Sequence, residues 1–206
     1  MREAPDEFKK SFTFLDLGNN CVDSEEKTQN DLQLIAAINR GDAAAFEILY
    51  RRYREWVHQL AYRFTGSHQD AQDVLQETFA YVVQKFPGFE LTSSMKTFLY
   101  PAIRNYSIAL RKKRKRSVQD ESMLELAVSD DDPSATQTSD LRHLLSSLSP
   151  SQQQVLMMRF VDDMTMPEIA AALEISTGTV KSRIHYAVRS LRESPVARAY
   201  FEGEGG

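Results

Sequence analysis

Apolar side chains recur at three- and four-residue steps along residues 31–116, which is the pattern of amphipathic helices. The longest stripe lies between Asp42 and Gly66 and consists of Phe46, Leu49, Tyr50, Tyr53, Val57, Leu60, Ala61 and Phe64. Asp42 is a favourable N-cap, and Gly66 can adopt the left-handed conformation that ends a helix. We therefore expect one long helix here, with one face buried.

Three further stripes predict three more helices in this segment. Their expected starts are Asp31, Ser67 and Met95. The side chains expected to be buried are Leu32, Ile35 and Ile38 in the first, Ala71, Val74, Leu75, Thr78, Phe79, Val82, Val83 and Phe86 in the second, and Met95, Phe98, Leu99, Ala102, Ile103, Tyr106 and Leu110 in the third. Pro101 removes a helical hydrogen bond, so the last helix either starts late or is kinked there. Helices this amphipathic pack on one another as a bundle.

A second helical zone covers residues 139–193. Its expected helix starts are Ser139, Ser149 followed by Pro150, Thr165 with Glu168 as a capping box, and Ser176. Its expected buried side chains are Leu141, Leu144, Leu145, Leu148, Val155, Leu156, Phe160, Ile169, Ala170, Leu173, Val180, Ile184, Ala187, Val188 and Leu191. Residues 117–138 are polar and weakly periodic, which is typical of a flexible linker. We expect an all-α protein with tails at residues 1–30 and 194–206.

Residues 165–192 have the pattern of a helix-turn-helix, in which a small residue, Ala170, lies where the two helices cross and Ile175 fills the turn. The second helix of such a unit enters the DNA major groove with its N-terminal part. The residues expected on that face are Thr179, Lys181, Ser182, Arg183, His185 and Tyr186. An ordinary helical hairpin without DNA remains an alternative.

The net charge of −4 argues against nucleic acid binding, but the distribution of charge argues for it. Residues 111–116 form an unbroken basic run at the end of the helix that carries Pro101. Basic groups supply affinity for phosphates, and aromatic rings stack on unpaired bases. We therefore expect single-stranded or melting DNA to bind Tyr100, Arg104, Asn105, Arg111, Lys112 and Arg114. A solvated charge run is the alternative for the basic segment alone.

The helix expected from Ser67 has a different polar face, formed by Asp70, Asp73, Gln76 and Glu77. Such a face is either plain acidic surface or a docking site for a basic protein partner, whose approach the charges would steer.

The sequence contains no motif that is typical of an enzyme active site. The sequence has no Gly-rich phosphate loop, no metal-ligand cluster and no paired nucleophile and base, so we expect no catalytic residue, metal or cofactor. One cysteine, Cys21, excludes an intramolecular disulfide. No apolar run is long enough to span a membrane, and no signal peptide is visible, so we expect a cytoplasmic protein.

Together these motifs resemble the extracytoplasmic-function (ECF) sigma factors of bacterial RNA polymerase, over residues 31–193. Residues 70–79, DAQDVLQETF, resemble the region-two helix that docks on polymerase, and Phe98-Leu99-Tyr100 with Arg104-Asn105 resembles the minus-10 helix. Residues 148–183 resemble region four, which binds the minus-35 element. Phe98 stands where the family usually has Trp.

The resemblance implies a sigma region 2 domain at residues 31–116 and a sigma region 4 domain at residues 139–193. It also implies core RNA polymerase, promoter DNA and an anti-sigma factor as partners. Two other functions fit part of the pattern. A helix-turn-helix regulator acting without polymerase would use the second domain alone, and a sigma-like mimic would only sequester an anti-sigma factor.

Overall fold

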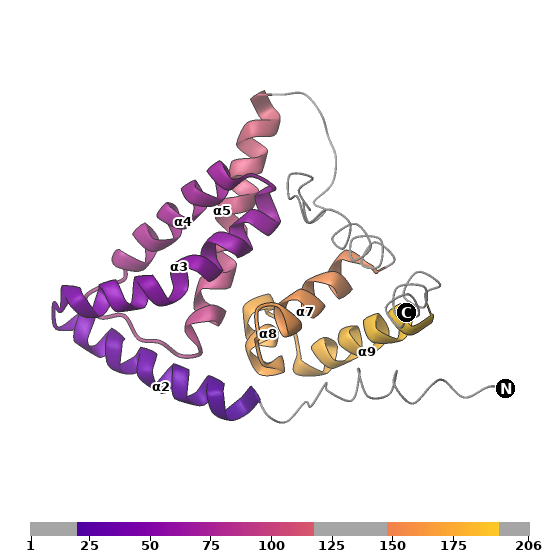
Figure 1. Ribbon diagram of the computed structural model, residues 1–206, viewed down its shortest axis with the longest axis horizontal. Helices are drawn as coiled ribbons and strands as arrows, with labels where there is room; N and C mark the ends of the chain where they lie inside the picture. Colours follow the sequence, from indigo (N-terminus) through magenta and orange to yellow (C-terminus); the bar gives the residue numbers. More distant parts are fainter. Residues whose placement is uncertain (1–19, 118–147, 194–206) are drawn as a thin grey trace, which may run out of the picture.

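The computed structural model describes residues 20–117 and 148–193, which form seven α-helices and no strand (Figure 1). The helices are α2 (Asn20–Asn39), α3 (Ala43–Thr65), α4 (His68–Val83), α5 (Met95–Ser117), α7 (Pro150–Phe160), α8 (Met166–Leu173) and α9 (Thr177–Glu193). The predicted all-α class is confirmed. We call α2–α5 the first domain and α7–α9 the second domain.

The first domain is built around α3, against which α2, α4 and α5 all pack. Its apolar stripe is buried as predicted, with Leu49, Val57 and Ala61 fully inaccessible to solvent. The predicted caps are also confirmed. The Asp42 side chain accepts hydrogen bonds from the amides of Ala44 and Ala45, and Gly66 ends the helix in the left-handed conformation. One helix therefore provides the surface on which the domain assembles.

Helix α2 begins at Asn20, so the prediction of an irregular tail is wrong for residues 20–30. This segment has no apolar stripe, but its Glu, Lys and Gln residues favour helix by intrinsic propensity. Asp31 is consequently no cap. It lies inside the helix, 1% exposed, while Leu32 faces outward at 38% exposure.

Two other residues expected in the core are exposed. Val83 ends α4 and Phe160 ends α7, with 51% and 46% of their surfaces accessible. Consecutive helix positions point about 100° apart, so Val82 is buried and its neighbour is not. In the second domain Met158 and Met164 fill the core instead.

The buried Asp31 ties α2 to α3. Its carboxylate pairs with Arg52 at 2.5 Å and accepts a hydrogen bond from the Tyr53 hydroxyl. A buried carboxylate needs such partners, because removing it from water is costly. At the other end of α2, the Asn39 side-chain oxygen accepts hydrogen bonds from the amides of Gly88 and Phe89, at 2.7 and 3.1 Å. Asn39 thereby holds the loop that leads into α5.

Helix α5 starts at Met95 and runs through Pro101 without ending there. Pro101 has no amide hydrogen to donate to the carbonyl of Thr97. The side chains of Met95, Leu99 and Ile103 are fully buried, so the apolar face of the helix is secured on both sides of the proline.

The second domain has the predicted helix starts at Ser149, Thr165 and Ser176. Ser149 and Thr165 both form complete capping boxes. The Ser176 hydroxyl accepts a hydrogen bond from the Thr179 amide at 3.0 Å. Leu148 is buried. The rest of the helix expected from Ser139, with Leu141, Leu144 and Leu145, lies outside the described residues, as do residues 1–19, linker residues 118–138 and the predicted tail 194–206.

Removing the hydroxyl in Tyr53→Phe should lower the free energy of unfolding by about 1.5–3 kcal/mol, because a buried hydrogen bond to a charged group is lost. Denaturant titration of the full chain would measure this change. Tyr50→Phe is the matched control, since the Tyr50 ring packs on Phe79 with centroids 4.7 Å apart and that contact survives the substitution. Equal effects of the two substitutions would contradict the assigned role of the Tyr53 hydroxyl.

Alkaline pH should destabilise the fold. Burial, followed by the hydrogen bond to Asp31, raises the pKa of Tyr53 far above its usual value, and burial also raises the pKa of Tyr100. The folded state therefore keeps protons that the unfolded chain releases above about pH 10, so the free energy of unfolding falls as pH rises beyond that point. Denaturant titrations between pH 8 and pH 11 should show a smaller loss in Tyr53→Phe than in the parent chain.

Candidate nucleic-acid and protein-binding surfaces

The second domain contains a complete helix-turn-helix formed by α8 and α9. Glu174 adopts a left-handed conformation with φ of 55°, which ends α8 and reverses the chain within a few residues. Val180, Ile184 and Ala187 are buried on the inner face of α9, and Ala170 is only 8% exposed where the helices pack. These contacts fix which side of α9 faces outward.

The outward side of α9 carries the residues predicted to read DNA. Lys181, Ser182, His185 and Tyr186 are exposed, while Thr179 and Arg183 are half-buried. The Ser182 hydroxyl donates to the carbonyl of Thr179 at 3.0 Å. Tyr186, 56% exposed, contacts the His185 ring edge-on. The structure thus gathers the six predicted residues on one helix that carries donors, acceptors and an aromatic ring.

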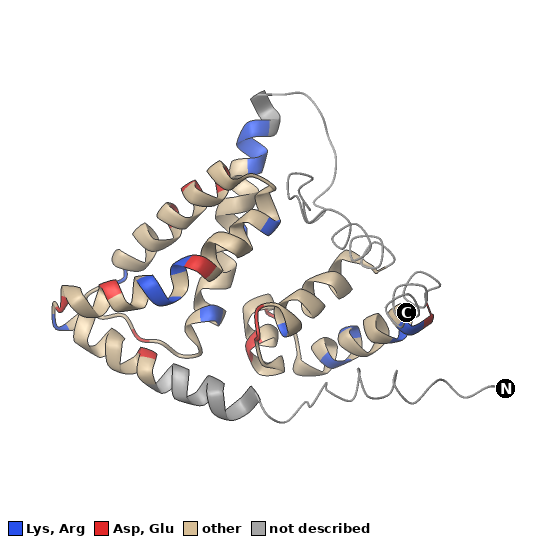
Figure 2. Ribbon diagram, in the orientation of Figure 1, with Lys and Arg blue, Asp and Glu red and all other residues tan. Residues whose placement is uncertain are grey.

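Helix α5 carries the second predicted DNA surface, and Figure 2 shows basic positions gathered toward its C-terminal end. Asn105, Lys112 and Arg114 are exposed, and Arg104 and Arg111 are half-buried. Arg111 donates to the carbonyl of Phe64, at 3.1 Å, which fastens this part of α5 to α3.

Tyr100 is placed differently from the other residues of this group. It is 2% exposed, and its hydroxyl accepts a hydrogen bond from Gln154 of α7 at 3.1 Å. Desolvation raises the pKa of Tyr100, so the phenol stays neutral. The Tyr100 ring also packs edge-on against Phe64 of α3, with centroids 6.1 Å apart, so Tyr100 lies between its own domain and the second domain.

The exposed face of α4 carries Asp73, Gln76 and Glu77, all accessible to a partner. Asp70, predicted to belong to the same face, is 2% exposed and pairs with Arg114 of α5 at 2.5 Å. Burial raises the pKa of Asp70, and Arg114 opposes that effect. Asp70 therefore joins the start of α4 to α5, and the structure brings one predicted docking residue together with one predicted DNA residue.

Sequence reasoning missed Asp162, which follows α7 and is 2% exposed. Its carboxylate accepts a hydrogen bond from Trp56 Nε1 at 2.7 Å and pairs with Arg63 at 2.5 Å. Its backbone carbonyl accepts from Lys96. Two acidic residues, Asp162 and Asp163, between the apolar Val161 and Met164 were the available signal. The partners of Asp162 lie 66 to 106 positions earlier in the chain.

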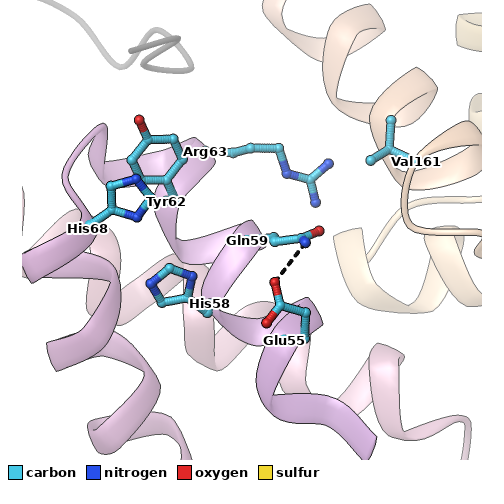
Figure 3. A pocket seen from close by; sticks show the side chains of 7 residues that line it. All are labelled: Glu55, His58, Gln59, Tyr62, Arg63, His68 and Val161. Carbon is cyan, nitrogen blue, oxygen red and sulfur yellow. Dashed lines mark hydrogen bonds between the residues drawn. The ribbon is translucent and has the colours of Figure 1, made fainter. Parts of the chain in front are cut away.

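Beside Asp162 lies an open pocket of about 360 Å³, lined by Glu55, His58, Gln59, Tyr62, Arg63, His68 and Val161. Figure 3 shows Arg63 extending from α3 toward Val161 of the second domain. The His68 ring stacks on Tyr62 with centroids 4.3 Å apart, and it also stacks on His58 with centroids 5.7 Å apart.

Within residues 20–117 and 148–193, no three His, Cys, Asp or Glu side chains group as metal ligands. In the same residues no helix combines the length and apolar character that crossing a bilayer requires.

Comparison with family models finds both domains. Residues 49–117 match Sigma-70 region 2, and residues 144–193 match Sigma-70 region 4. The RNA polymerase sigma-E factor of Streptomyces coelicolor is 31% identical over 159 residues, covering 77% of this chain and 90% of that protein. The ECF RNA polymerase sigma factor SigW of Bacillus subtilis is 27% identical over 178 residues, covering 77% of this chain and 93% of SigW.

Two solved structures share the fold. CnrH, in complex with the cytosolic domain of CnrY, superposes with a TM-score of 0.60 at 22% identity, covering 80% of this chain and 96% of CnrH. The sigma factor RpoE of Bartonella quintana, in complex with the anti-sigma factor NepR, gives a TM-score of 0.55 at 24% identity, covering 72% of this chain and 94% of RpoE.

A helix-turn-helix regulator that works without polymerase accounts for the second domain only, whereas the matches extend over both domains in the predicted order. The chain therefore belongs to the ECF group of the sigma-70 family, the sigma factors that direct RNA polymerase to promoters.

Proposed function

We propose that this sigma factor divides its task among three surfaces: α4 binds core RNA polymerase, α9 reads the minus-35 duplex, and α5 holds the melted minus-10 strand. The observation that carries the proposal is the separation of these surfaces on different helices, each held rigid by its own buried face. No surface has to serve two ligands at once.

Helix α9 has the geometry for the minus-35 element. A helix fits the major groove, and its N-terminal side chains reach base edges. Arg183 offers two parallel donors that match the acceptors of guanine, and Lys181 offers a charge for phosphate. Tyr186 provides an exposed apolar ring for contact with sugar or a thymine methyl group.

Helix α5 has the groups that bind an unpaired strand. Asn105 exposes an amide that can donate to and accept from a base edge, and Lys112 and Arg114 supply charge for the backbone. Tyr100 joins this surface by stacking on a base only after Gln154 leaves it. Opening of the domains is thus part of the proposed mechanism.

On α4, Asp73, Gln76 and Glu77 form the polymerase surface, where exposed carboxylates steer association with a basic partner. Asp70 is proposed as a positioning residue, because its carboxylate already pairs with Arg114. The exposed Val83 at the end of α4 adds apolar area to the same helix.

An anti-sigma factor is the expected inhibitor. Two solved relatives support this expectation: RpoE is bound to the anti-sigma factor NepR, and CnrH is bound to the cytosolic domain of CnrY. We place the protein in the cytoplasm, where polymerase and promoters are, and we assign it no catalytic residue, metal or cofactor of its own.

Run-off transcription tests the whole proposal. Core RNA polymerase with the purified chain should initiate at discrete genomic promoters and give no discrete product without the chain. Glu77→Lys should reduce the product by weakening capture of polymerase, whereas Glu47→Lys, on the exposed side of α3, should leave it unchanged. A chain that binds duplex DNA alone yet never associates with core polymerase would overturn the proposal.

The assignment of α9 is tested by Arg183→Ala. Loss of a two-donor contact to a base should cost about 1–3 kcal/mol in binding and relax the preference at one base pair of the minus-35 element. Anisotropy of labelled promoter fragments with reconstituted holoenzyme would measure both effects, with Arg54→Ala, an exposed position on α3, as the matched control. Unchanged affinity and sequence preference would place the DNA contact elsewhere.

A further inference from the structure

Three of the described polar contacts between the two domains converge on one residue, Asp162. Trp56 and Arg63 of α3 both bind the Asp162 carboxylate, and Lys96 at the start of α5 binds its backbone carbonyl. The Lys96 ammonium also lies 5.8 Å from the centre of the Trp56 ring, a favourable cation–π distance. These three donors belong to the first domain, and the group they surround belongs to the second.

From this convergence we infer that the free chain closes on itself, with Asp162 as a latch that holds the second domain over the start of α5. The latch consists of Trp56, Arg63, Lys96 and Asp162. Helix α8 packs on α5 beside it, and Gln154 of α7 binds the Tyr100 hydroxyl. Closure therefore buries an aromatic ring of the surface that we assign to the melted strand, and this consequence rests on the proposed function.

Burial strengthens the ion pair between Arg63 and Asp162 in the latch. Arg63 and Asp162 retain only 18% and 2% of their side-chain exposure, so salt screens their attraction far less than it screens a surface pair. The indole of Trp56 adds a directional hydrogen bond to the same oxygen. Removing either partner alone would leave the other as an uncompensated buried charge.

The latch is also incomplete, which makes it reversible. Asp162 Oδ2 and the Arg63 atoms Nε and Nη1 are buried without a protein hydrogen-bond partner among the described residues. Water would satisfy these atoms on separation of the domains, which offsets part of the loss of the closed contacts. The closed form is therefore suited to exchange with an open one, and polymerase and promoter DNA would select the open form.

Among the described residues, the hydrogen bonds of the Asp162 side chain are made across the interface, to Trp56 and Arg63. Replacing it should consequently open the domains and leave both folded. Trp56 is the only tryptophan of the chain, so its fluorescence reports directly on the latch.

Two measurements on the full chain without polymerase test closure: acrylamide quenching of Trp56 and the radius of gyration from small-angle X-ray scattering. Asp162→Asn removes the charge and Asp162→Lys reverses it against Arg63 and Lys96. Both should red-shift the emission, raise the quenching constant severalfold and increase the radius of gyration by several ångström, with Lys stronger than Asn. Glu47→Gln, which removes one exposed carboxylate of α3, is the matched control and should change neither quantity.

Circular dichroism separates opening from unfolding, because opening preserves the helical signal. Closure is overturned if the parent chain already has the quenching constant and radius of the Asp162→Lys variant, or if that variant keeps the parent values with its helices intact. Neither result depends on transcription, so failure of the latch is distinguishable from failure of the sigma-factor assignment.

A third measurement tests the masking of α5. Binding of a labelled single-stranded oligonucleotide should tighten in Asp162→Asn in proportion to the closed fraction of the parent, about tenfold if nine-tenths of the parent is closed. An open variant that binds the strand no better than the closed parent would show that closure does not mask the DNA surface.

Discussion

The burial of one face of α3 is the constraint on which the first domain depends. Helices α2, α4 and α5 all pack against α3, and helices in proteins gain most of their stability from such packing of an apolar face. The outer faces of α4 and α5 are left for partners because their inner faces are committed to α3. The positions of the binding surfaces are therefore a consequence of packing.

Three buried carboxylates, those of Asp31, Asp70 and Asp162, join separate parts of the chain. Each pairs with an arginine at 2.5 Å: the first links α2 to α3, the second α4 to α5, and the third the two domains. Hydrogen bonds between an arginine and a carboxylate are directional. Each pair therefore adds a geometric restraint to the apolar packing around it.

Most of the fold could be predicted from the sequence because the helix signals are local. Asp42, Ser149 and Thr165 cap helices where their side chains indicate, and the apolar stripes of α3 and α9 are buried as their spacing requires. The start of α2 could not be predicted from periodicity, since residues 20–30 carry no apolar stripe. In the candidate site, the exposed face of α9 follows from helical geometry alone. The burial of Tyr100 and Asp70 does not, because their partners lie 54 and 44 positions away in the sequence and only the tertiary arrangement brings them together.

The pair of Asp70 and Arg114 has a consequence for how the two ligands of the first domain influence each other. Two anionic groups compete for Arg114: the carboxylate of Asp70 at the start of α4, and a phosphate of the DNA strand that α5 is proposed to hold. If DNA takes Arg114, the start of α4 gains an uncompensated negative charge, which attracts a basic protein surface more strongly. Thermodynamic linkage makes this effect mutual, so that a protein bound to α4 would release Arg114 for DNA. A single ion pair can in this way make the two binding events cooperative without any change in the backbone.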